Sequence, residues 1–145
     1  MPNPIRLVVE SEYAAADARF LEDRLYDFNV AATGLADGRL LAIFVRGEDG
    51  QIRAGLCGHT WGGCCEIRQL WVHESLRHQG LGTSLLQAAE AEARQRGCQQ
   101  IVLTTHSFQA PGLYRRLGFQ LIAAVDNYPH RHQHLLFRKP LEGAG

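Results

Sequence analysis

The sequence predicts an α/β (α+β) fold, with one domain built on a mixed, mostly antiparallel sheet. Three extended segments follow one another between residues 39 and 72 with short turns between them, which favours an antiparallel meander. A further apolar segment, residues 100–105, follows a long amphipathic helix, and this order is typical of a right-handed parallel crossover. At 145 residues, 46% of them apolar, the chain suffices for one core and is too short for two. We therefore expect residues 1–145 to form a single domain.

The first third of the chain predicts a short strand and one amphipathic helix. Residues 5–9 are an apolar strand candidate, and Ser11 is a candidate N-cap for the helix that follows. The apolar positions of that helix recur at helical spacing, at Ala16, Phe20, Leu21 and Leu25. We expect the helix to end before Gly34, with Asn29 as a candidate break.

The meander is predicted from three apolar segments separated by turn residues. Residues 39–46 are rich in Leu, Ile, Phe and Val, and Asp49-Gly50 carries the chemistry of a hairpin turn. Residues 52–61 resume an extended pattern, Gly62-Gly63 turns the chain, and residues 64–72 complete the three strands.

The second half of the chain predicts a long helix, a short helix and three more strands. The long helix begins at about Leu81, and Gly97 is well placed just past its end. Its apolar stripe consists of Leu85, Leu86, Ala89 and Ala93. The short helix is expected at residues 110–117, and the strands at residues 100–105, 119–125 and 134–138. In all, the prediction is six or seven strands flanked by three or four helices.

Charge and cysteine content restrict the class of protein. Fifteen basic residues balance fifteen acidic ones, so no overall field favours a nucleic-acid or membrane partner. The chain shows neither a signal peptide nor an apolar run approaching the ~20 residues that span a bilayer. The four cysteines form no C-x-x-C pair and are expected to be small buried residues: Cys57, Cys64, Cys65 and Cys98. A reduced, cytoplasmic setting is therefore expected.

A basic, glycine-bearing turn joins the third meander strand to the long helix. It reads RHQGLG, from Arg77 to Gly82. Glycines let a backbone approach a ligand closely, and the first free N–H groups of a helix attract anions. No G-K-[ST] follows and no G-x-G-x-x-G is present, so neither common nucleotide-binding loop is matched. The turn predicts an anion site, and a pyrophosphate is the expected anion.

This turn resembles the [Q/R]-x-x-G-x-[G/A] motif of the GNAT superfamily N-acetyltransferases. Arg77, Gly80 and Gly82 supply it, and AEARQRG closes the helix much as in that family. The segment SFQAPGLYRRLGF resembles the family's later A-x-x-x-Y-x-x-x-G-F segment, at Ala110, Tyr114, Gly118 and Phe119. The resemblance covers residues 66–119 by motif and residues 5–139 by element order.

The resemblance implies a sheet splayed at its centre, between the fourth and fifth expected strands, with acetyl-CoA in the cleft as co-substrate and no metal. Backbone groups of residues 70–72 would pair with the pantetheine arm, and those of residues 79–84 would bind the pyrophosphate. Ser107 stands where many members carry Asn, so its assignment as a pantetheine contact is weaker. The implied coenzyme contacts are Leu70, Trp71, Val72, Arg77, His78, Gln79, Gly80, Leu81, Gly82, Thr83, Ser84, Ser107, Ala110, Tyr114 and Arg116.

The resemblance also implies two catalytic groups. Tyr114 takes the place of a general acid that protonates the departing thiolate, with a packing role as the alternative. Glu66 takes the place of a general base, with a water relay or a merely solvated carboxylate as alternatives; His59, His73 and His106 are further candidate bases. Strict alternation would put Glu66, Arg68 and Leu70 on one strand face, and a bulge would change that count.

The acceptor is the least defined part of the prediction. Acidic residues on and near the first helix, with Tyr26 and Trp61 as candidate walls, favour a primary amine on a small cationic molecule. Histidines at residues 130–134 are not spaced as a metal site. The alternatives are a non-catalytic acyl-CoA sensor and a protein or tRNA acetyltransferase, and zero net charge disfavours an RNA acceptor. A homodimer is left open.

Overall fold

The computed structural model describes residues 1–141, which form two units divided after Ala36. The first unit holds one helix, α1 (Ala15–Thr33), which begins four residues after Ser11, the expected cap. It ends as expected at Gly34, whose left-handed backbone lets its N–H bond Val30 O at 2.7 Å. The helix is continuous through Asn29. Residues 5–9 form no strand, because this unit contains no second strand to pair with them.

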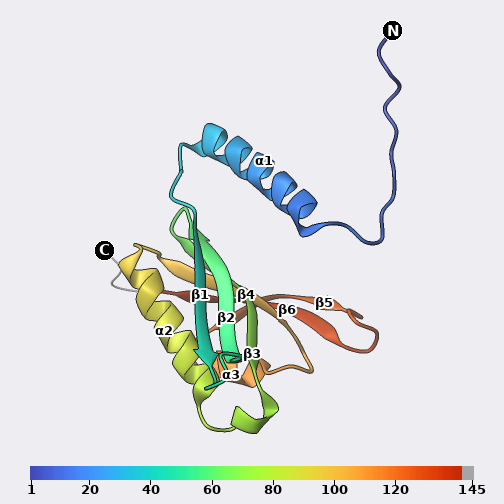
Figure 1. Cartoon of the computed structure of the whole chain (residues 1–145). Helices are drawn as coiled ribbons and strands as arrows, with labels where there is room; N and C mark the ends of the chain where they lie inside the picture. The colour runs from blue at the N-terminus through green and yellow to red at the C-terminus, as the bar shows by residue number, and fades with distance from the viewer. Residues whose placement is uncertain (142–145) are drawn as a thin grey trace. The chain divides into compact units, whose positions relative to one another are not determined.

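The second unit, from Asp37, is a six-stranded sheet with helices packed on it (Figure 1). The strands are β1 (Arg39–Arg46), β2 (Ile52–Trp61), β3 (Cys64–Val72), β4 (Gln100–His106), β5 (Gln120–Asp126) and β6 (Gln133–Pro140), in the order β1-β2-β3-β4-β6-β5. Only β3 and β4 are parallel. The helices are a 3-10 turn η1 (Glu74–Leu76), α2 (Leu81–Gln95) and α3 (Pro111–Arg116). The predicted mixed, mostly antiparallel sheet is confirmed.

The sheet opens between β3 and β4, as the resemblance implied. Residues 64–67 of β3 pair with residues 100–103 of β4, and no pairing continues beyond them. The last five residues of β3 therefore have a neighbour on the β2 side only. This opening lies at the end of β3 that leads into η1 and α2 (Figure 1).

One face of the sheet carries the core of the second unit. The predicted stripe of α2, including Leu85 and Ala89, is buried in a single cluster with Ile67, Leu103 and Phe137 of the sheet and with Tyr114 of α3. We call this the covered face. Side chains alternate along a strand, so Val102, Thr104 and His106 point to the other side. Within residues 37–141 no helix covers that side, which we call the open face.

Candidate active site

The turn between β3 and α2 has the geometry of an anion site. His78 and Gly80 adopt left-handed backbone conformations, with φ of 63° and 77°, and Gly80 is the N-cap of α2. The first intrahelical bond runs from Ser84 N to Gly80 O, at 3.0 Å. The N–H groups of residues 81–83 precede it and have no acceptor among the described residues. Together with the helix dipole they form a cradle for an anionic group.

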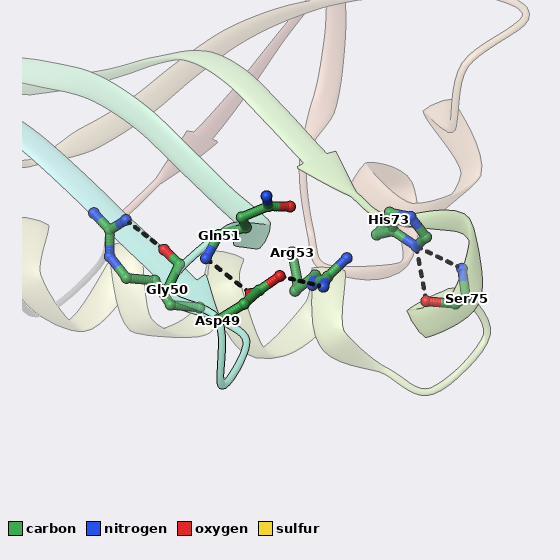
Figure 2. Close-up of polar contacts among 7 residues, drawn as sticks. Asp49, Gly50, Gln51, Arg53, His73 and Ser75 are labelled. Atoms are coloured by element: carbon green, nitrogen blue, oxygen red, sulfur yellow. Dashed lines mark hydrogen bonds and ion pairs between the residues drawn. The ribbon is translucent and has the colours of Figure 1, made fainter.

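Arg77 is fixed beside this cradle. Its Nε donates to Val72 O at 3.0 Å, which leaves the terminal guanidinium nitrogens for an anion. His73 caps η1: its Nδ1 accepts from Ser75 N at 3.1 Å and lies 2.7 Å from Ser75 Oγ (Figure 2). This ring is therefore engaged in holding the loop, which argues against His73 as the base.

The backbone of β3 is exposed to the opening on alternate residues. His73 N donates to Arg53 O on β2, at 2.8 Å. Because alternate residues of a strand direct their N–H and C=O groups to opposite sides, those of Val72 and Leu70 point into the opening, and those of Trp71 point to β2. Leu70, and Val72 through its N–H, can therefore pair with an extended ligand as an added strand would, since Val72 O already accepts from Arg77 Nε. Trp71 offers its side chain only.

A β-bulge in β3 changes which side chains face the core. Cys57 of β2 pairs with Gln69, and the next residue, Gly58, pairs with Ile67, so Arg68 is the extra residue. Ile67 is buried, and after the bulge Leu70 packs against the same core. The expectation from strict alternation, which put Glu66 and Leu70 on one face, is therefore wrong. The bulge leaves Glu66 on the open face, beside the opening.

We expect Gly58→Ala to be strongly destabilising. A Cβ at this position would overlap the carbonyl oxygen of Glu66, which is backbone and cannot move aside without breaking the bulge. The expected loss of unfolding free energy is about 2 kcal/mol or more, and urea denaturation measures it. The matched control is Gly50→Ala, which has no atom within 4 Å of the added Cβ and bears only the penalty of its left-handed backbone. Equal losses in the two variants would contradict this close approach.

Glu66 lines a cavity of about 280 Å³ at the opening, with walls from both diverging strands and from β6. Its Oε2 lies 3.2 Å from Arg68 Nε and 3.6 Å from His59 Nδ1. Its Oε1 has no partner among residues 1–141, and the side chain is 43% exposed. The carboxylate is thus held in place through one oxygen, and the other oxygen is free to accept a proton.

Tyr114 is buried, with 7% of its surface exposed, and its ring packs against Phe119 and Phe137 at centroid distances of 5.8 and 5.9 Å. Burial raises the pKa of its phenol above the ordinary value, so the group is protonated at neutral pH. Within the described residues no group forms a hydrogen bond with the hydroxyl. The side chain therefore packs in the core and also carries a proton with no protein partner.

Not all of the other predicted site residues lie at the opening of the sheet. Gly82 brings the first turn of α2 against α3, since a Cβ there would lie 3.3 Å from Leu113 Cδ2. Ser107 is committed to β6: its Oγ accepts from Gln133 N at 2.9 Å, and its N–H bonds Gln133 O. Trp61 lies beside Cys64, at the end of β3 opposite the opening. Tyr26 belongs to the first unit.

The remaining predicted contacts lie before α2 and at the two ends of α3. Gln79 donates to Ser75 O at 3.4 Å, Ala110 is the N-cap of α3, and Arg116 is exposed on α3. A feature that sequence reasoning missed is a cluster of rings around His106, at the end of β4. Its signal was the density of histidines at residues 130–134, considered only as a metal site. Among residues 1–141 no three His, Cys, Asp or Glu side chains are placed to hold a metal.

The candidate site thus has three parts: the anion cradle at the start of α2, the open edge of β3 and the buried phenol of Tyr114 on α3. Residues 7–119 match the Acetyltransferase (GNAT) family. The chain belongs to this family. Acetyltransferase Atu2258 of Agrobacterium fabrum is 38% identical over 118 residues, which cover 81% of this chain and 86% of that protein. Blasticidin-S acetyltransferase of Streptomyces morookaense is 40% identical over 89 residues, which cover 61% of this chain and 65% of that protein.

Solved structures agree with the GNAT assignment. The crystal structure of an acetyltransferase from Bacillus cereus superposes with a TM-score of 0.76 at 28% identity, covering 92% of this chain and 98% of the other. This GNAT protein is therefore an acetyltransferase. No helix in the described part of the chain has the length and apolar character to cross a membrane.

Proposed function

We propose that this GNAT protein transfers an acetyl group from acetyl-CoA directly to a primary amine of a small, cationic molecule. The observation that carries the proposal is the coincidence of two features at one end of β3. Unpaired amides at residues 81–83 offer a site for the diphosphate, and the unpaired edge of β3 offers one for the pantetheine arm. A thioester held at both places would bring its acyl carbon to the cavity that Glu66 lines.

Each proton in the reaction has a candidate carrier. An alkylammonium with a pKa of about 10.4 must lose a proton before its nitrogen can attack the thioester carbonyl. Glu66 Oε1, directly or through a water, accepts that proton. The C–N bond forms, the C–S bond breaks, and the departing sulfur takes the proton of the Tyr114 phenol. The second proton that the nitrogen loses on becoming an amide returns through water to the Tyr114 phenolate, and Glu66 releases its proton to solvent. Burial keeps that phenol protonated at neutral pH.

The relatives support a small acceptor. They include a blasticidin-S acetyltransferase and, at 33% identity over 84 residues, an IAA acetyltransferase of Azospirillum brasilense. The family match runs from residue 7 to residue 119 and so spans both units. We propose on this basis that residues 1–145 serve as one N-acetyltransferase domain.

A panel of primary amines with acetyl-CoA, followed by release of free thiol, tests the proposed function. Transfer to one or more small amines is expected. Silence across the panel, with coenzyme binding intact, would favour the acyl-CoA sensor. Transfer to peptide or tRNA amines alone would favour the macromolecular alternative.

Glu66→Gln is expected to lower kcat by about 10- to 100-fold at neutral pH, because the amide cannot accept the proton from the amine. Glutamine retains the shape of the glutamate side chain, and the affinity for the coenzyme should stay within about twofold of the wild type. Glu48→Gln is the control: it makes the same change at an exposed carboxylate in the turn between β1 and β2, and it should keep the wild-type kcat. An unchanged kcat in Glu66→Gln, with the pH profile also unchanged, would assign proton removal to another group.

A further inference from the structure

Five rings gather where β4 ends and the β5–β6 hairpin turns, and we call them the ring cluster: His106, Phe108, Tyr128, His132 and His134. Phe108 stacks on His106 with centroids 5.4 Å apart and planes 5° apart. Tyr128 stacks on His134 at 5.1 Å and 28°, and the two imidazoles lie 4.7 Å from each other. Tyr128 also meets His106 edge-on at 5.3 Å, and His132 meets Phe108 edge-on at 5.0 Å. Phe108 and Tyr128 are each 55% exposed.

The ring cluster lies next to the proposed site of transfer. Thr104 and Leu136 are partners across β4 and β6, and both line the cavity that contains Glu66. His106 and His134 are the next partners on the same face of the sheet. Two residues along a strand span about 6.6 Å, so the cluster begins about one side chain beyond the cavity. Both lie on the open face, opposite the face that α2 covers.

Hydrogen bonds of both backbone and side chains hold the cluster in place. The hairpin is tied to the segment after β4 by Ser107, which bonds Gln133 through both its N–H and its hydroxyl at 2.9 Å. Tyr128 O lies 3.3 Å from His106 Nδ1, and Gln133 Nε2 bonds Asp126 Oδ1 at 2.8 Å. The ring faces are therefore positioned before any ligand arrives, which reduces the ordering cost of binding.

Packing alone does not account for this arrangement. His134 Nδ1 is buried and has no hydrogen-bond partner in the described chain, which is unfavourable for a purely structural ring. Two large rings, Phe108 and Tyr128, also stay half in solvent instead of entering the core. A cluster of ring surfaces beside a cavity is suited to a further flat ring.

We propose that the ring cluster is a subsite for a planar aromatic or heteroaromatic group of the acceptor, joined by a short linker to the amine that is acetylated. The inference rests on the proposed function for its orientation: the amine reaches the cavity at Glu66 while the ring lies against Phe108 or Tyr128. Offset stacking contributes about 0.5–1.5 kcal/mol for each ring pair, which corresponds to a preference of about 2- to 10-fold per pair.

Two amines of equal carbon number test the subsite: 2-phenylethylamine and 2-cyclohexylethylamine. For the wild-type protein, kcat/KM is expected to be about tenfold higher for the aromatic amine. The ratio should fall toward one in Phe108→Leu and Tyr128→Leu, with the KM for acetyl-CoA unchanged. Phe44→Leu is the matched control, since Phe44 is a 47%-exposed ring on β1, and it should keep the wild-type ratio.

Saturation-transfer NMR of both amines, with CoA present, separates this inference from the proposed function. Transfer to both amines without a ring preference, or a preference that survives both substitutions, overturns the subsite and leaves the proposed function standing. Ring binding that is lost in both variants, without acetylation of any amine, supports the subsite and contradicts the proposed function. If the aromatic amine is neither acetylated nor bound, the subsite is wrong.

Discussion

Replacing Tyr114 with phenylalanine is expected to lower kcat for acetyl transfer by about 100-fold, the range of a lost general acid. The hydroxyl has no hydrogen-bond partner among residues 1–141, and the ring keeps its contacts with Phe119 and Phe137. The folded structure should therefore persist, with coenzyme affinity within about twofold of the wild type. Steady-state kinetics and a binding titration of acetyl-CoA separate these two effects.

The pH dependence of wild-type kcat adds a check on this assignment. Burial raises the pKa of Tyr114 above its ordinary value of 10.0, so the proton needed by the sulfur is retained throughout the neutral and mildly alkaline range. Kcat should not fall through loss of this proton below pH 10. Tyr13→Phe, at a 68%-exposed position, is the control and should behave as wild type. A Tyr114→Phe variant with wild-type kcat would show that Tyr114 packs in the core and is not the general acid.

Gly82→Asp is expected to weaken acetyl-CoA binding by about 10- to 100-fold, because it adds a negative charge close to the diphosphate at the start of α2. The same charge should stabilise the free helix by about 0.3–1 kcal/mol, since negative charge is favoured at a helix N-terminus. The substitution is tolerated sterically, because the closest atom is the flexible end of Leu113. Calorimetric titration should therefore show weaker binding of acetyl-CoA, whereas thermal melting should show an unchanged or higher Tm.

Gly82→Asn is the matched control for charge. It has almost the shape of aspartate, and its affinity for acetyl-CoA should lie much nearer to wild type. The salt dependence should differ as well, since added salt screens the repulsion in Gly82→Asp. Equal loss of affinity in both variants would show that crowding against Leu113, and not charge, determines binding at this turn.

The elements of the sheet were largely predictable because their signals are local. The bounds of β1, β2 and β3 coincide with the predicted ranges, since Asp49-Gly50 and Gly62-Gly63 mark the turns between them. Gly80 and Gly97 mark the two ends of α2, where both adopt left-handed conformations.

Features that depend on pairing between distant segments were not predictable. The strand expected at residues 5–9 has no partner in its unit, and an apolar run does not show whether one exists. The predicted assignment of the β3 side chains to the two faces of the sheet was wrong, because the bulge arises where Gly58 of β2 approaches the backbone of Glu66. The ring cluster depends on the register that puts His106 opposite His134, which neither segment specifies alone.

The most direct test of the account is a crystal structure of the protein with acetyl-CoA bound. We expect the diphosphate oxygens about 3 Å from the backbone nitrogens of residues 81–83, and the pantetheine arm along the open edge of β3 at Leu70 and Val72. The sulfur should lie within reach of the Tyr114 hydroxyl. A coenzyme seated elsewhere on the protein, with those amides and that strand edge unoccupied, would contradict the account.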